Sequence, residues 1–82
     1  MLQCNERDLI DHCTALLVRR CKRNGNRFDQ PAFGASEALE EDGRIYVLLR
    51  NGHGTLAVYC KESEEKRMRF IEAADWPLEL MM

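Results

Sequence analysis

The sequence lacks the features that mark several large classes of protein. No apolar run is long enough to span a bilayer, and the N-terminal segment does not have the charged-then-apolar order of a secretory signal. There is also no internal repeat, no low-complexity tract and no linker. We therefore expect a cytoplasmic protein that forms one domain over residues 1–82 and has no membrane partner.

Spacings typical of metal ligands are missing as well. The chain has four cysteines and two histidines, but no Cys-x-x-Cys pair and no histidine three to five residues from another. No sequence context indicates an activated thiolate beside His12 or His53. In a cytoplasmic protein we expect all four cysteines to be free thiols: Cys4, Cys13, Cys21 and Cys60. Three of the four should pack on or beside apolar faces. The sequence predicts no metal, no cofactor and no catalytic residue, and therefore no enzyme.

The composition is that of a small globular protein. The residues are 45% hydrophobic and 32% charged, and the net charge is only -2. This charge gives no general attraction to nucleic acid or to anionic lipid, so any such attraction requires a local patch. A chain of 82 residues builds a modest core, near the size at which a metal, a disulfide or a partner becomes necessary. We therefore expect association with a partner, and most simply with a second copy of the chain.

A helix is predicted from about Glu6 to Asn24. Asn5 is a good N-cap, acidic residues follow it, and basic residues precede Gly25, which stops the helix. Arg20 projects from the apolar arc, so its stem should run along apolar surface or its guanidinium should meet a buried carboxylate. The arc itself should pack on a sheet and consists of Leu9, Ile10, Cys13, Leu16, Leu17 and Cys21.

Residues 43–60 contain the clearest signal in the sequence. Two stretches of β-branched and aromatic residues flank a glycine-rich turn, which is typical of an antiparallel hairpin. A turn at Gly52-His53 places Leu49 opposite Leu56, and the same register continues with Val47 opposite Val58 and Ile45 opposite Cys60. The hairpin is then apolar on both faces. A helix on one face leaves the other in water, with its apolar residues Tyr46, Leu48, Ala57 and Tyr59.

The hairpin is expected to have a strand on each side. Residues 36–41 could form one helical turn capped by Ser36, but Asp42-Gly43 is a hairpin signal, and we predict a strand with Leu39 opposite Tyr46. Residues 66–72 predict a half-exposed edge strand. The fold class is therefore α+β, with one N-terminal helix packed on an antiparallel meander of three or four strands and a short C-terminal tail or helical turn.

Aromatic residues outside these elements are expected to close the core. In the loop over residues 26–35, Phe28 and Phe33 should plug one end of it. In the tail, Trp76, Leu78 and Leu80 should fold back over the sheet. Both expectations assign large apolar side chains in connecting segments to structure and not to a site.

Two features favour a protein-interaction module of the adaptor or inhibitor type. The apolar face of Tyr46, Leu48, Ala57 and Tyr59 would serve as a homodimer interface. Acidic residues crowd two turns, over 37–42 and 62–65, which should lie at the same end of the sheet. They would steer a basic protein partner, with Glu40, Glu41 and Glu64 as the expected contacts. The small size suits an accessory protein of a bacterium, phage or mobile element.

The alternative function is nucleic-acid binding. Basic residues gather where the predicted helix ends, and Arg19, Arg23 and Arg27 would contact phosphates beside Phe28. Cations are, however, expected at a helix C-terminus for the dipole alone, and no RNP, KH or zinc-knuckle pattern accompanies them. The protein-interaction hypothesis is therefore the preferred one.

Overall fold

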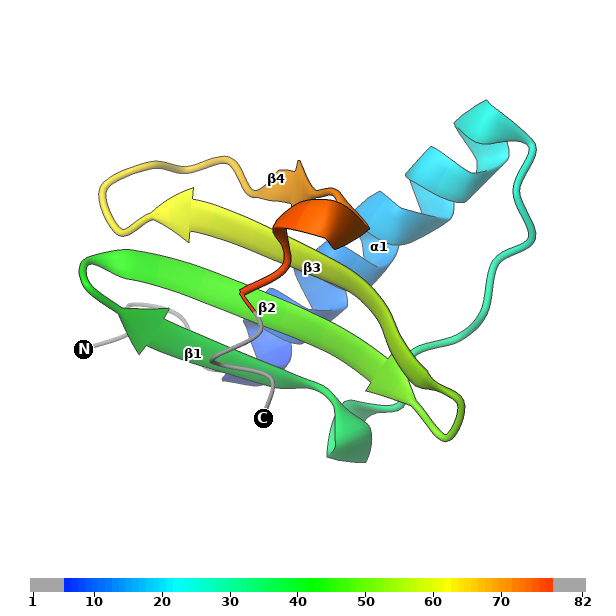
Figure 1. Cartoon of the computed structure of the whole chain (residues 1–82), viewed down its shortest axis with the longest axis horizontal. Helices are drawn as coiled ribbons and strands as arrows, with labels where there is room; N and C mark the ends of the chain where they lie inside the picture. Colours follow the sequence, from blue (N-terminus) through cyan, green and yellow to red (C-terminus); the bar gives the residue numbers. More distant parts are fainter. Residues whose placement is uncertain (1–5, 78–82) are drawn as a thin grey trace.

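The structure, a computed structural model, describes residues 6–77. One helix packs across one face of a four-stranded antiparallel sheet with strand order β1-β2-β3-β4, which confirms the predicted α+β class (Figure 1). The strands are β1 (Glu37–Glu41), β2 (Arg44–Asn51), β3 (Gly54–Glu62) and β4 (Arg69–Ile71). Among the described residues, no helix combines the length and the apolar character needed to cross a bilayer.

The helix α1 spans Glu6–Asn24, as predicted. It ends because Gly25 adopts a left-handed φ of 69° and Asn26 N–H turns back to the carbonyl of Cys21 at 2.9 Å. The predicted N-cap, Asn5, lies outside the described residues. The buried side of the helix consists of Leu9, Ile10, Cys13 and Leu17, with Leu16 and Cys21 packed beside them. The apolar arc of the sequence is therefore confirmed.

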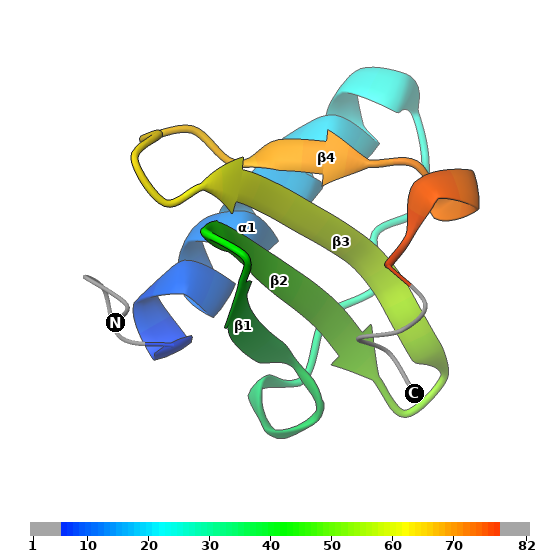
Figure 2. The same ribbon diagram turned by 60° about the vertical axis from the view of Figure 1, so that its left-hand side comes forward.

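The helix crosses the sheet diagonally. Near its start, Oε2 of Glu6 accepts a hydrogen bond from Ala38 N–H of β1 at 3.1 Å. Near its end, the guanidinium of Arg20 lies 3.7 Å from the ring centroid of Phe70 in β4. Figures 1 and 2 both show the helix behind the sheet, with its last turns beside β4. We call the sheet face toward α1 the inner face and the opposite face the outer face.

The first hairpin forms as predicted. Asp42 and Gly43 make the turn with φ values of 51° and 76°, which suits a two-residue turn of the mirror-image type. The register sets Leu39 opposite Tyr46 and Ala38 opposite Val47. Ser36 does not begin a helical turn, because β1 follows it directly; it is the C-cap residue of the 3-10 turn Phe33–Ala35. Its hydroxyl accepts a hydrogen bond from Arg50 N–H at 2.9 Å and ties the start of β1 to the end of β2.

The second hairpin has the predicted turn but not the predicted register. Asn51 pairs with Gly54 and Arg50 with Thr55, so Gly52-His53 is the turn. A β-bulge then shifts the strands, and Leu49 pairs with Ala57 instead of Leu56. The prediction that Leu49, Val47 and Ile45 face Leu56, Val58 and Cys60 is therefore wrong; their partners are Ala57, Tyr59 and Lys61.

The bulge exchanges the faces of β3. Because Leu56 is the extra residue, Ala57 and Tyr59 join the inner core while Val58 and Cys60 move to the outer face. The predicted grouping of Tyr46, Leu48, Ala57 and Tyr59 on one exposed face is therefore wrong. The inner face gains instead an edge-to-face contact between the rings of Tyr59 and Phe70, whose centroids are 5.6 Å apart.

Three further predictions have mixed outcomes. Arg20 follows the first of its two options, since it lies along the Phe70 ring and pairs at 3.4 Å with the exposed Glu72. Phe28 packs against the core as predicted. Phe33 does not and is 48% exposed, because the 3-10 turn Phe33–Ala35 places its ring under the guanidinium of Arg7, 5.5 Å away. The loop therefore closes the core with one aromatic residue only.

The edge strand and the tail are shorter than expected. β4 covers only Arg69–Ile71, and a 3-10 turn follows at Ala73–Asp75. Trp76 is half-buried, and its indole N–H donates to the carbonyl of Ile71 at 3.1 Å. The predicted contacts of Leu78 and Leu80 lie outside the described residues.

Candidate functional site

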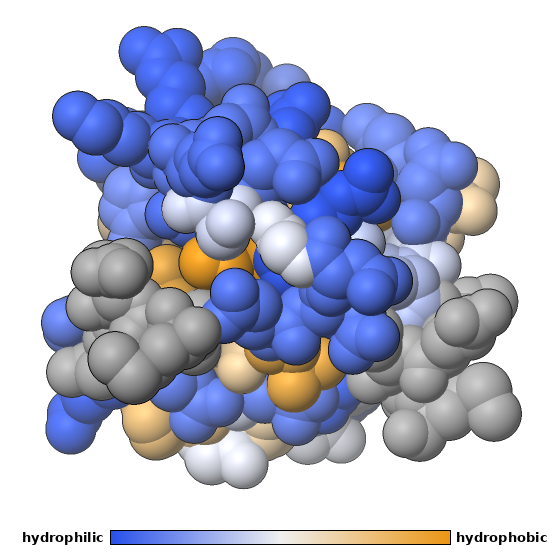
Figure 3. Space-filling model, turned by 90° about the vertical axis from the view of Figure 1, so that its left-hand side faces the viewer, coloured by the Kyte–Doolittle hydropathy of each residue, from blue (hydrophilic) through white to orange (hydrophobic). Residues whose placement is uncertain are grey.

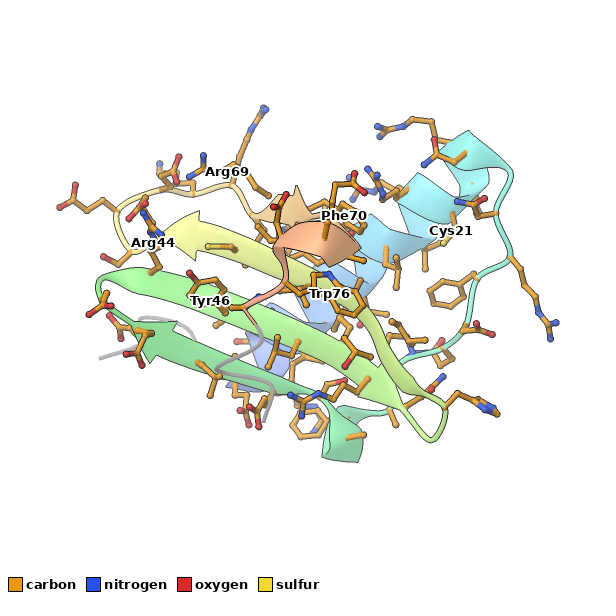
Figure 4. The ribbon with its side chains drawn as sticks, viewed as in Figure 1. Cys21, Arg44, Tyr46, Arg69, Phe70 and Trp76 are labelled. Carbon is orange, nitrogen blue, oxygen red and sulfur yellow. The ribbon has the colours of Figure 1, made fainter. Side chains whose placement is uncertain are left out.

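A hollow of about 390 Å³ opens on the outer face of the sheet. Its neutral lining comes from Tyr46 of β2, Cys60 of β3, Ile71 of β4 and Pro77. Phe70 of β4 also borders the hollow, although its ring packs against Tyr59 on the inner face. The register places Tyr46 beside Cys60, and Cys60 beside Arg69, so one row of cross-strand neighbours runs through it. In Figure 4 the outer face is turned toward the viewer, with Tyr46 and Trp76 labelled on it.

Charges of both signs surround the same hollow. Arg44, Glu62, Arg69 and Asp75 contribute two positive and two negative groups. Nε of Arg44 lies 3.0 Å from Oε1 of Glu62, and Arg69 pairs with Glu65. The rim is thus electrically balanced around half-buried apolar groups, an arrangement that resembles the apolar centre and polar rim of protein interfaces.

The predicted interface residues are divided by the sheet. Tyr46 is half-buried on the outer face, where it lines the hollow. Leu48 lies on the same face but is fully buried at 0% exposure. Ala57 and Tyr59 lie in the inner core, with exposures of 0% and 3%. Of the four predicted residues, only Tyr46 is therefore placed to meet a partner without unfolding the domain.

The acidic turns lie at one end of the sheet, as predicted. Ser63 N–H donates to the carbonyl of Gly43 at 2.8 Å, so the β1-β2 and β3-β4 connections touch. Figure 3 views the molecule from this end and shows a mostly hydrophilic surface with small, separate apolar areas. Glu40, Glu41 and Glu64 are exposed there. Their role in steering a basic partner stays a prediction.

Part of this acidity is neutralised locally. Oε1 of Glu65 accepts the N–H of Glu62 at 3.0 Å, and this hydrogen bond, followed by the charge of Arg69, lowers the pKa of Glu65. Glu62 in turn pairs with Arg44. The β3-β4 connection is therefore a network of mixed charge.

The thiols differ in environment. Cys13 has no exposed surface, and burial raises its pKa from 9.0 to about 12. Cys60 is half-buried in the lining of the hollow, and burial is also the main cause of its raised pKa, although Tyr46 acts in the opposite direction. Both thiols stay protonated at neutral pH, whereas a nucleophilic cysteine needs a depressed pKa. Within residues 6–77, no three His, Cys, Asp or Glu side chains are placed to share a metal ion.

Most residues of the hollow could not be predicted from the sequence. Arg44, Arg69, Cys60 and Asp75 were not identified as site residues because they meet only when β2, β3 and β4 are aligned correctly. The bulge, which decides that alignment, leaves no clear mark in the sequence. Comparisons of the chain with protein families, with curated proteins and with solved structures found no match.

Proposed function

We propose that this protein is a non-enzymatic protein-interaction module that forms a homodimer through the outer face of its sheet. The observation that carries the proposal is the hollow, in which half-buried apolar groups lie inside a rim with two arginines and two carboxylates. In a two-fold symmetric dimer the same patch meets itself, so each positive group of one copy can face a negative group of the other. The rim has the balanced charge that such self-complementarity requires.

Size supports the same proposal. The surface of the chain measures 5786 Å², of which a standard interface would cover about 800 Å². A domain this small gains proportionately more from covering apolar surface than a large one does. The raised pKa values of Cys13 and Cys60 support a binding role over thiol catalysis, because a protonated thiol is a poor nucleophile.

Sedimentation equilibrium of wild type and Tyr46→Glu tests the proposal. We expect the wild type to be dimeric at tens of micromolar and Tyr46→Glu to be monomeric, because the carboxylate would be desolvated in the apolar centre of the interface. Leu48→Glu would be a poor probe, since Leu48 is fully buried within one chain and the substitution would unfold it.

The matched control is Ala15→Glu, which adds the same charge on the exposed side of α1. This variant should remain dimeric. A monomeric wild type, or equal dissociation of the Tyr46→Glu and Ala15→Glu variants, would contradict the proposed interface. Circular dichroism of each variant establishes that any monomer is folded.

A further inference from the structure

The two ends of α1 carry opposite charge and lie over opposite edges of the sheet. The first turn contains Glu6 and Asp8, and the last contains Lys22 and Arg23. The acidic end bonds to β1 through Glu6, while Arg20 near the basic end contacts Phe70 of β4. Because the helix runs diagonally, a molecule with a net charge of only -2 has a concentrated basic region at one corner.

Four cations form this region, which we call the helix-end cluster: Arg19, Lys22, Arg23 and Arg27. All four are exposed. None forms an ion pair with any residue in the described range 6–77, whereas Arg20, Arg44, Arg50 and Arg69 each pair with a glutamate. The cluster therefore concentrates uncompensated positive charge, while arginines elsewhere are neutralised within the fold.

The helix dipole accounts for only part of the cluster. Its negative end is equivalent to about half an elementary charge, and the effect falls off within the last turn. Arg19 lies before that turn and Arg27 lies in the loop beyond Gly25. Arg19 also stands one turn from Arg23, so their side chains are neighbours on the helix surface. Four cations exceed what stabilisation of one helix end requires.

We propose that the helix-end cluster binds the phosphodiester backbone of nucleic acid. Guanidinium groups match phosphate oxygens with two parallel hydrogen bonds, and several weak contacts along a chain of phosphates add up through counterion release. The cluster presents charge along a helix end and the following loop, which suits a linear polyanion. Because the contacts are to phosphates, binding is independent of sequence. The helix lies on the opposite side of the sheet from the hollow, so this surface is separate from the proposed dimer interface (Figure 1).

Fluorescence anisotropy with a labelled single-stranded RNA and a labelled DNA duplex tests the proposal and distinguishes the two sources of phosphodiester. The wild type should bind with micromolar affinity at low salt and lose affinity as salt rises. In the triple variant Arg19→Gln/Arg23→Gln/Arg27→Gln, affinity should fall at least about tenfold, and the log-log salt slope for duplex should shrink by about 0.9 for each phosphate that the variant no longer neutralises. Unrelated sequences should be affected equally.

The matched control is Arg7→Gln/Lys66→Gln/Arg67→Gln, which removes the same charge from exposed residues outside the cluster. It should keep its affinity within about twofold, because phosphate contacts and not net charge determine binding. An equal loss in both triple variants would overturn the proposal, as would no binding of either probe by the wild type. Binding to anionic phospholipid vesicles without binding to nucleic acid would also overturn it. If circular dichroism shows that the triple variant Arg19→Gln/Arg23→Gln/Arg27→Gln is unfolded, the single variants Arg19→Gln and Arg27→Gln replace it. Each should also lose affinity for nucleic acid, by a smaller factor.

Discussion

The two faces of the sheet differ although both are rich in apolar residues. On the inner face, Val47, Leu49 and Ala57 have 0% exposure beneath the helix. On the outer face, Leu48 and Val58 are equally buried, but Leu39, Tyr46 and Cys60 in the neighbouring row are only half-buried. Apolar composition alone therefore does not tell which face is the core. The inner face is covered by the helix, while the outer face has a hollow.

The largest expected difference between the faces concerns leucine truncation. Leu49→Ala on the inner face should lower the free energy of unfolding by about 2–5 kcal/mol, since it leaves a cavity in a closed core. Leu39→Ala, the same change at a half-buried outer position, should cost about 1 kcal/mol, because water and neighbours can fill the space. Urea unfolding at low protein concentration measures both. Equal losses would mean that the outer face is as closed as the inner one.

The second difference concerns alkaline pH and the thiols of Cys13 and Cys60. The unfolded Cys13 loses its proton near pH 9.0, whereas the folded one holds it to about 12. The contribution of the Cys13 thiol to the free energy of unfolding is thus fully present below pH 9.0 and is lost as pH rises toward about 12. One pH unit above the unfolded pKa, the loss should be about 1.4 kcal/mol.

Urea unfolding over this pH range checks the prediction. Cys13→Ala should flatten the pH dependence, with Tyr59 providing part of what remains because burial raises its pKa from 10.0 to about 12. Cys60→Ala should flatten the pH dependence less than Cys13→Ala does, because Cys60 is only half-buried on the outer face, although burial raises its pKa as well. A flat profile in the wild type would show that Cys13 is hydrated and that the inner face is not closed.

The smallest expected effect concerns Trp76 on the outer side of β4. Trp76→Phe keeps an aromatic ring but removes the indole N–H that donates to the carbonyl of Ile71, which should cost about 1 kcal/mol. Amide hydrogen exchange should become faster in β4 and remain unchanged in β2. Faster exchange throughout the sheet would show that Trp76 supports the whole fold and not one edge.

Local signals were sufficient to predict the helix and the first hairpin. Caps, charge and apolar periodicity all agreed on Glu6–Asn24. For residues 36–41 a helical turn was the alternative, but a turn at Asp42-Gly43 placed apolar residues opposite one another and favoured the strand. These elements depend on residues close together in the chain. Their prediction therefore did not require knowledge of the tertiary fold.

The second hairpin shows where sequence reasoning failed. When only one face of a strand is apolar, the sequence predicts its register, because a slip of one residue would bury polar groups. In β3, Val58 and Cys60 alternate with Ala57 and Tyr59, so both registers bury apolar side chains. The packing of Tyr59 against Phe70 and of Leu56 against the inner core favours the bulged register, and both contacts are tertiary. The hollow on the outer face could not be predicted for the same reason.

The two edge strands each have a main-chain group already bound by a side chain, Ala38 N–H by Glu6 and the Ile71 carbonyl by Trp76. An incoming strand would have to displace these bonds before it could extend the sheet. Partners that add a β-strand to an exposed edge are therefore disfavoured, and so is edge-to-edge polymerisation of copies of the chain into fibres. The proposed dimer would then depend on side-chain contacts, so that point substitutions on the surface could abolish it without changing the backbone.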